Sequence, residues 1–191
     1  MEASGRLPVG VRHGYGVAAL SLAIGNTAII FFLLKYLTDE AGLSGFEAGL
    51  VVFVGKIYDA VVDPFAGWLS DRTRTSWGAR RPWILGGSAP FALLFAALWW
   101  GLPVSGVWAT VIYAVLFIAY STAYTAVVVP YGALTPALTD DYDERTRLNA
   151  SRMAWSMIGG LFCAIVASAF AEGMGFWRIT GLALGASPPA W

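Results

Sequence analysis

Five stretches of this sequence are each long and apolar enough to cross a lipid bilayer. A spanning helix takes about 20 mainly apolar residues. The five stretches lie near residues 14–36, 46–70, 82–102, 107–134 and 148–171, and a partial sixth lies near 176–187. Each is predicted to be a helix, because backbone that faces lipid must satisfy its own hydrogen bonds. The two-residue alternation of a membrane β-strand is absent. The sequence therefore predicts an all-α, polytopic membrane protein.

The composition fits a membrane protein and argues against several other classes. Charged residues make up 13% of the sequence and hydrophobic residues 58%, whereas a soluble domain has about 25% charged residues. The net charge is zero and no basic run exceeds two residues, so we expect no nucleic-acid partner. The sequence shows no credible nucleophile–base pair or metal cluster, and its one histidine is His13. We therefore expect no enzymatic activity and no cofactor.

Basic residues are concentrated on one side of the predicted helices. Lys and Arg are enriched in the short cytoplasmic loops of membrane proteins. The opposite side has only Lys35 and Arg178. The concentrated set comprises Arg6, Arg12, Arg72, Arg74, Arg80, Arg81, Arg145 and Arg147. We therefore expect an integral membrane protein of the bacterial inner (plasma) membrane, with its N-terminus in the cytoplasm.

Two aspartates, Asp59 and Asp63, lie one helical turn apart inside the second apolar stretch. Their spacing places both carboxylates on one helix face. A charge at the bilayer centre costs about 2.5–3.5 kcal/mol, so such residues indicate an ion or substrate pathway. Two ionised carboxylates repel each other, and a Na⁺ ion between them or one shared proton relieves that repulsion. The alternative is a structural ion pair with Lys56, three residues before Asp59.

Residues 59–83 join this acidic pair to a basic loop in a specific pattern. The matching residues are Asp59, Asp63, Pro64, Asp71, Thr73, Arg74, Trp77, Gly78, Pro82 and Trp83. This pattern resembles the major facilitator superfamily, and more closely its glycoside–pentoside–hexuronide:cation symporters, the melibiose-permease-like branch. Residues 124–136 and 143–160 match more weakly, and the resemblance extends over nearly all of residues 10–185. It implies the N-terminal six-helix half of that fold, with the sixth helix truncated and the C-terminal half absent.

The resemblance also implies a role for each matching side chain. Asp59 and Asp63 would bind the coupling ion, Na⁺ or H⁺, with Thr125 as a hydroxyl ligand and no permanently bound metal. Arg152 and Lys56 would line the solute cavity, with weaker contributions from Asn26, Tyr120 and Tyr124. The alternatives are that Arg152 snorkels to the cytoplasmic edge and that the tyrosines only pack or anchor.

The loop after the second stretch would be a cytoplasmic gating motif. Its residues are Gly67, Asp71, Arg72, Arg74, Gly78, Arg80 and Arg81. In the superfamily such a cluster pairs across helices and holds the outward-facing state, and its breaking accompanies the rocking of the two halves. The alternative is that the arginines only determine topology.

Four positions depart from the melibiose-type pattern. Ser21 and Val128 stand where sugar-binding acids are expected, Gly132 where an aromatic platform is, and Val62 where an asparagine of the cation motif is. These changes argue against galactoside recognition. The missing asparagine favours H⁺ slightly over Na⁺.

The sequence thus predicts a cation-coupled symporter of a sugar or another small polar solute, in the form of an incomplete N-terminal half. Its expected partners are the solute, the lipid bilayer and either a C-terminal half or a second copy of the chain. One alternative is a half-size membrane scaffold or subunit that does not transport. Another is a transporter of lipids or amphipathic solutes with the same fold, which Val128 and Gly132 favour.

Overall fold

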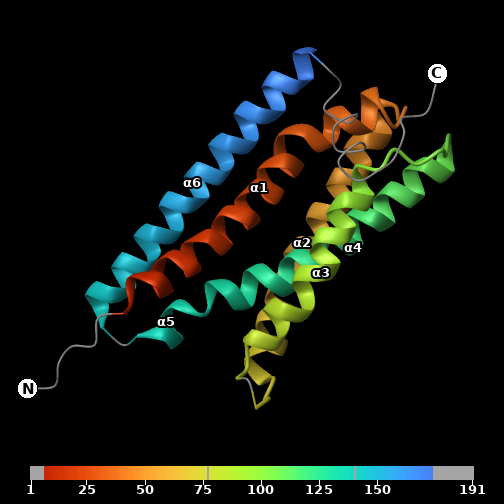
Figure 1. Ribbon diagram of the computed structural model, residues 1–191. Helices are drawn as coiled ribbons and strands as arrows, with labels where there is room; N and C mark the ends of the chain where they lie inside the picture. Colours follow the sequence, from red (N-terminus) through yellow and green to blue (C-terminus); the bar gives the residue numbers. More distant parts are fainter. Residues whose placement is uncertain (1–6, 77, 140, 174–191) are drawn as a thin grey trace, which may run out of the picture.

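The computed structural model describes residues 7–76, 78–139 and 141–173, and within these ranges it contains helices and loops but no strand (Figure 1). The helices are α1 (Val9–Asp39), α2 (Gly45–Arg72), α3 (Arg81–Leu98), α4 (Val107–Gly132), α5 (Thr135–Leu138) and α6 (Tyr142–Gly173). The predicted all-α class is confirmed. The five long helices correspond to the five predicted stretches, and the predicted partial helix near 176–187 lies outside the described residues.

Helix bounds differ from the predicted ones, that of α6 because hydropathy marks the apolar part of a helix and not its polar end. α6 begins at Tyr142 rather than near 148, with Asp143 and Glu144 in its first turn, where acidic side chains complement the helix dipole. α3 ends at Leu98 rather than near 102. Gly101, with φ of 65°, then turns the chain towards α4. The single turn α5 has only four residues and was not predicted.

Three of the described helices, α1, α3 and α4, are long and apolar enough to cross a membrane by length and composition alone. α2 is 28 residues long but carries Lys56, Asp59 and Asp63 near its middle. These charged side chains lower the hydropathy of α2. They are also among the residues predicted to bind the coupling ion and the solute. The N-terminus of α2 is fixed by a capping box, in which Ser44 and Glu47 each bond the other's backbone N–H.

The helices form two groups: α1 lies beside α6 (Figure 1), and α4 packs against both α2 and α3. Glycines allow the close approaches. A Cβ added at Gly159 on α6 would lie 2.7 Å from the carbonyl oxygen of Leu20 on α1. One added at Gly55 on α2 would lie 2.2 Å from the ring of Phe117 on α4. Small residues at such crossings are typical of membrane helix packing.

A tyrosine pair joins the two groups. The rings of Tyr15 on α1 and Tyr131 on α4 stack with centroids 4.6 Å apart. The Tyr131 hydroxyl donates a hydrogen bond to the backbone carbonyl of Tyr15, and the Tyr15 hydroxyl bonds Thr135 on α5 at 2.8 Å. α4 is thereby held against α1 as well as against α2 and α3. Its polar side chains can therefore contact α1 on one side and α2 on another.

Candidate functional site

The hydroxyl of Thr125 on α4 donates a hydrogen bond to Oδ1 of Asp63 on α2, with a distance of 2.7 Å. Thr125 is 2% exposed, so its hydroxyl is held inside the helix packing. The two residues are 62 positions apart in the sequence. The fold therefore brings together two of the three residues that the sequence predicts as ligands of a coupling ion.

Asp59, the third predicted ligand, pairs with a lysine of its own helix. Nζ of Lys56 lies 2.9 Å from Oδ2 of Asp59. The Asp59 side chain is 20% exposed and that of Lys56 is 54% exposed. Lys56 thus places a positive charge against one oxygen of the acidic pair. The structural ion pair that the sequence allowed as an alternative is present, and it uses the same carboxylate as the predicted ion site.

Pro64 adds a further oxygen atom to this region. It lies inside α2 directly after Asp63. Proline has no N–H, so the carbonyl of Ala60, four residues earlier, lacks its usual helical donor. Carboxylate, hydroxyl and carbonyl oxygens are the ligands that hard cations take. In the described part of the chain, no third His, Cys or acidic side chain joins the two aspartates to form a metal-binding group.

A cavity of about 500 Å³ lies between α1, α4 and α6. Its polar side chains are Asn26, Tyr124, Tyr131, Arg152 and Ser156. Three of these, Asn26, Tyr124 and Arg152, belong to the predicted solute cavity. Tyr124 directly precedes Thr125, whose hydroxyl bonds Asp63. The cavity and the acidic pair are therefore neighbours across α4.

Arg152 is half-buried in this cavity. A Cβ added at Gly132 would lie 3.8 Å from its Nη1, an ordinary van der Waals distance, so the guanidinium lies directly beside Gly132. Within the described residues no hydrogen bond or ion pair involves Arg152. Its donor fork remains available, and such a fork suits a carboxylate, a phosphate or a pair of hydroxyls. The neighbouring walls are apolar and include Val128, Met153 and Met157.

The structure places Lys56 and Tyr120, the other two predicted solute residues, outside this cavity. Lys56 pairs with Asp59 on α2. The Tyr120 ring is 3% exposed and packs among Phe91, Phe95 and Phe117. Its hydroxyl is buried without a hydrogen-bond partner in the described part of the chain. Tyr120 thus packs in the interior between the helices, which is the alternative role that the sequence allowed.

Two polar features were not predicted. Ser156 lines the cavity one helical turn after Arg152, and the four-residue spacing between them was the signal that could have indicated it. The hydroxyls of Tyr58 on α2 and Thr122 on α4 lie 2.9 Å apart, close in sequence to Asp59 and Thr125. Their pairing depends on how α2 and α4 face each other, and a single sequence carries no direct signal of that.

The predicted gating motif forms bonds between three helices. Nη2 of Arg80, which precedes α3, lies 3.1 Å from Oδ1 of Asp71 on α2. Nη1 of the same guanidinium donates a 2.6 Å hydrogen bond to the carbonyl oxygen of Ala133, at the end of α4. One arginine therefore links the ends of α2, α3 and α4 on the side where the basic loop lies.

The other motif residues shape the loop around Arg80. Gly78 has φ of 93°, a conformation that favours glycine. The half-buried Gly67 on α2 lies close to α4, where an added Cβ would be 3.6 Å from Val129. The guanidinium carbon of Arg72 lies 4.1 Å from the centroid of a Trp68 ring. Arg74 and Arg81 are exposed and bond no other described residue.

Three helices long and apolar enough to span a membrane, a carboxylate–hydroxyl bond between α2 and α4, and a cavity with a few polar side chains beside it are the features of an integral membrane protein. Residues 14–184 match the family described as MFS/sugar transport protein, and the chain belongs to this major facilitator superfamily family. The predicted resemblance to its symporter branch is confirmed, and the chain corresponds to part of the N-terminal half.

Similar proteins carry transporter names. The chain is 44% identical over 173 residues to an uncharacterized symporter of Synechocystis sp., a match that covers 84% of the chain and 30% of the relative. It is 37% identical over 161 residues to the sodium-dependent lysophosphatidylcholine symporter 1-B of Danio rerio, covering 84% and 31%. It is 35% identical over 143 residues to the glucuronide carrier protein homolog of Escherichia coli, covering 74% and 31%. The chain thus spans about a third of the length of these relatives.

Proposed function

We propose that this protein is the N-terminal part of a secondary active transporter that couples a small solute to Na⁺ or H⁺. The observation that carries the proposal is the 2.7 Å hydrogen bond from Thr125 to Asp63, one turn from Asp59. Ionisable groups at membrane depth are costly and mark ion pathways. A buried hydroxyl aimed at one of them supplies an oxygen ligand at a fixed position.

In this proposal the ion binds between Asp59 and Asp63 with Thr125 and the Ala60 carbonyl as further ligands. The Lys56 ammonium occupies one oxygen of Asp59 when no ion is bound and moves aside when one is. Because the ligands come from both α2 and α4, binding joins these helices more tightly. The sodium-dependent lysophosphatidylcholine symporter among the relatives supports Na⁺ as the ion.

The solute binds in the cavity between α1, α4 and α6, where Arg152 supplies hydrogen-bond donors and Asn26 and Ser156 supply polar contacts. A solute with a carboxylate or several hydroxyls satisfies the Arg152 fork. A C-terminal half or a second copy completes the cavity, since transporters of this fold bind solute between two halves. The N-terminus faces the cytoplasm, as the basic loops indicate, and the membrane is the bacterial inner membrane.

A second candidate is an amphipathic solute with an anionic head and an apolar tail. The observation that favours it is the pairing of Arg152 with apolar walls at Val128, Met153 and Met157. A head group would bond the guanidinium while a tail contacts these side chains. The lysophosphatidylcholine symporter among the relatives carries an amphipathic solute in its name.

Uptake into proteoliposomes tests both candidates. Labelled glucuronide and labelled lysophosphatidylcholine are offered with an inward Na⁺ gradient, an inward H⁺ gradient or no gradient. The proposal is supported if uptake of one solute requires a gradient, falls at least tenfold in Arg152→Gln and is retained in Lys35→Gln. The solute that is taken up then identifies the solute class. Gradient-independent uptake, or equal uptake by both variants, contradicts the proposal, and a complete absence of uptake favours a scaffold role.

A further inference from the structure

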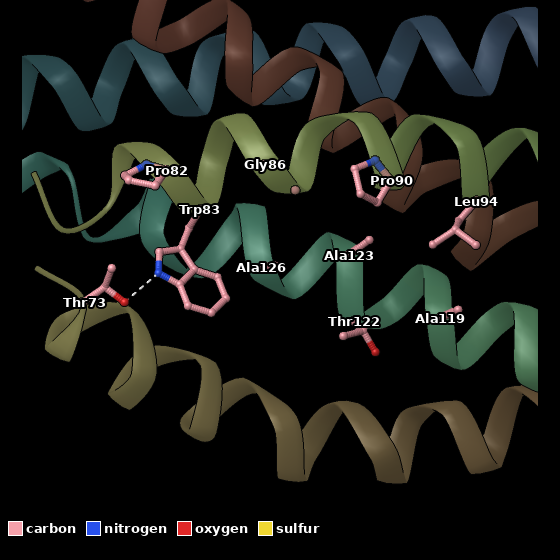
Figure 2. A pocket seen from close by; sticks show the side chains of 11 residues that line it. Thr73, Pro82, Trp83, Gly86, Pro90, Leu94, Ala119, Thr122, Ala123 and Ala126 are labelled. Carbon is pink, nitrogen blue, oxygen red and sulfur yellow. Dashed lines mark hydrogen bonds between the residues drawn. The ribbon is translucent and has the colours of Figure 1, made fainter. Parts of the chain in front are cut away.

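A second hollow, separate from the solute cavity, runs along the surface between α3 and α4 (Figure 2). Its volume is about 720 Å³. Small side chains form its floor, among them Gly86 on α3 and Ala119, Ala123 and Ala126 on α4. It is an apolar groove, and none of the residues assigned above to ion or solute binding lines it.

The groove has the length of one bilayer leaflet. On α3 it extends from Trp83 to Leu94, which is about 16 Å at a rise of 1.5 Å per residue. The hydrocarbon core of a bilayer is about 30 Å thick, so one leaflet occupies about half of that. The groove thus begins beside the α2–α3 loop and extends along most of α3, and its length matches that of one acyl chain.

Arginines flank the loop end of the groove in the sequence. Residues 71–81 contain four arginines and one aspartate. Nε1 of Trp83 donates a 2.9 Å hydrogen bond to Oγ1 of Thr73, and both residues line the groove (Figure 2). Arg74 follows Thr73 and Arg81 precedes Pro82, another lining residue. Both arginines are exposed and bond no residue in the described part of the chain, unlike Arg80, which is held by Asp71 and Ala133.

We propose that this groove binds one anionic phospholipid, with an acyl chain between α3 and α4 and the phosphate at Arg74 and Arg81. The lipid belongs to the leaflet beside the α2–α3 loop. Guanidinium groups bind phosphate oxygens through two parallel hydrogen bonds, and basic residues next to membrane helices attract anionic head groups. The bound lipid fills the groove, and its phosphate links the end of α2 to the start of α3 through Arg74 and Arg81.

Native mass spectrometry of the purified protein tests this site. Delipidated protein is titrated with dioleoyl phosphatidylglycerol or, separately, with dioleoyl phosphatidylcholine. We expect one adduct with the anionic lipid at an affinity about tenfold above that with the zwitterionic lipid. Gly86→Leu fills the groove, and nothing lies within 4 Å of an added Cβ there, so the variant is expected to fold and to lose this adduct.

Further variants separate the acyl-chain contact from the head-group contact. Ala119→Leu fills the groove from α4 and gives a second test if Gly86→Leu fails to fold. Arg81→Gln is expected to bring the two lipids to equal affinity while keeping the adduct. Gly49→Leu on α2, also at an open position, is the matched control and should bind like the parent. Equal affinity of the parent for both lipids, or an unchanged adduct in both groove-filling variants, would overturn the proposal.

Discussion

The Thr125 hydroxyl on α4 donates a 2.7 Å hydrogen bond to the Asp63 carboxylate on α2, and Thr125 itself is almost completely buried. Asp59 lies one turn before Asp63 on the same helix and pairs with Lys56. One carboxylate is thus joined to a neighbouring helix and the other to an exposed cationic side chain of its own helix. An ion that binds both carboxylates would therefore affect both the Thr125–Asp63 hydrogen bond and the Lys56–Asp59 ion pair.

Replacing Thr125 by valine removes the hydroxyl and preserves the shape of the side chain. The hydrogen bond to Asp63 is lost, and a bond to a charged group contributes about 1.5–3 kcal/mol. We expect a lower melting temperature and an ion-induced thermal shift reduced at least by half. Thr122→Val is the matched control, because Thr122 lies on the same helix but bonds Tyr58. Equal loss of the ion-induced shift in both variants would mean that Thr125 is not a ligand.

Replacing Lys56 by glutamine removes the cation that occupies Asp59. The ammonium lies against one oxygen of Asp59. An ion in the proposed site would compete with it for that oxygen, so we expect Na⁺ to bind several-fold more tightly in Lys56→Gln. Isothermal titration calorimetry measures the affinity directly. The control is Lys35→Gln, which breaks the Lys35–Asp39 pair of α1. An unchanged affinity in Lys56→Gln would show that Lys56 does not compete with the ion.

The two partners of the loop ion pair are expected to differ in their effect on stability. Asp71 is 62% exposed, and an exposed pair contributes about 0–1 kcal/mol, so Asp71→Asn should be nearly neutral. Arg80→Gln also leaves the Ala133 carbonyl without its donor, which adds about 1–3 kcal/mol. Chemical denaturation in detergent compares the two variants. A larger effect of Asp71→Asn would contradict the central position of Arg80.

Adding a methyl group at Gly159 should separate α1 from α6. The obstacle is the backbone of Leu20, with its carbonyl oxygen 2.7 Å and its Cα 3.2 Å from an added Cβ. Backbone cannot rotate away, so Gly159→Ala is expected to cost about 1–3 kcal/mol. Gly14→Ala on α1 has nothing within 4 Å of an added Cβ and should be neutral or slightly stabilising. Thermal melts of both variants check this, and equal melting temperatures would contradict the close crossing.

The long helices were predictable because a spanning segment must be apolar over about 20 residues. Asp59 and Asp63 were predictable for the converse reason, since charges are costly in such a segment. Only the family resemblance predicted Thr125 as a ligand of the ion. Its contact with Asp63 depends on how α2 and α4 face each other. Nothing in the sequence of one helix specifies that facing.

The buried position of Tyr120 and the groove between α3 and α4 could not be predicted, because both depend on how the helices pack. A tyrosine in a membrane helix has the same local sequence signal whether it lines a cavity or packs against Phe91. Gly86 and Ala119 are small residues of the kind that usually allow close packing, yet here they leave a groove. Packing between helices decides whether a tyrosine lines a cavity and whether small residues leave a groove. The hydropathy of the sequence gives no information about that packing.

The most direct test of the proposed ion site is the thermal shift of the purified protein upon addition of Na⁺ or a change of pH. Parent, Asp59→Asn and Asp63→Asn are compared, with Asp39→Asn as the control for a carboxylate paired elsewhere. We predict a saturable, ion-dependent rise in melting temperature that the parent and Asp39→Asn share and both site variants lose. A folded parent whose melting temperature does not respond to Na⁺ or pH, or site variants that respond like the parent, would contradict an ion site at Asp59 and Asp63.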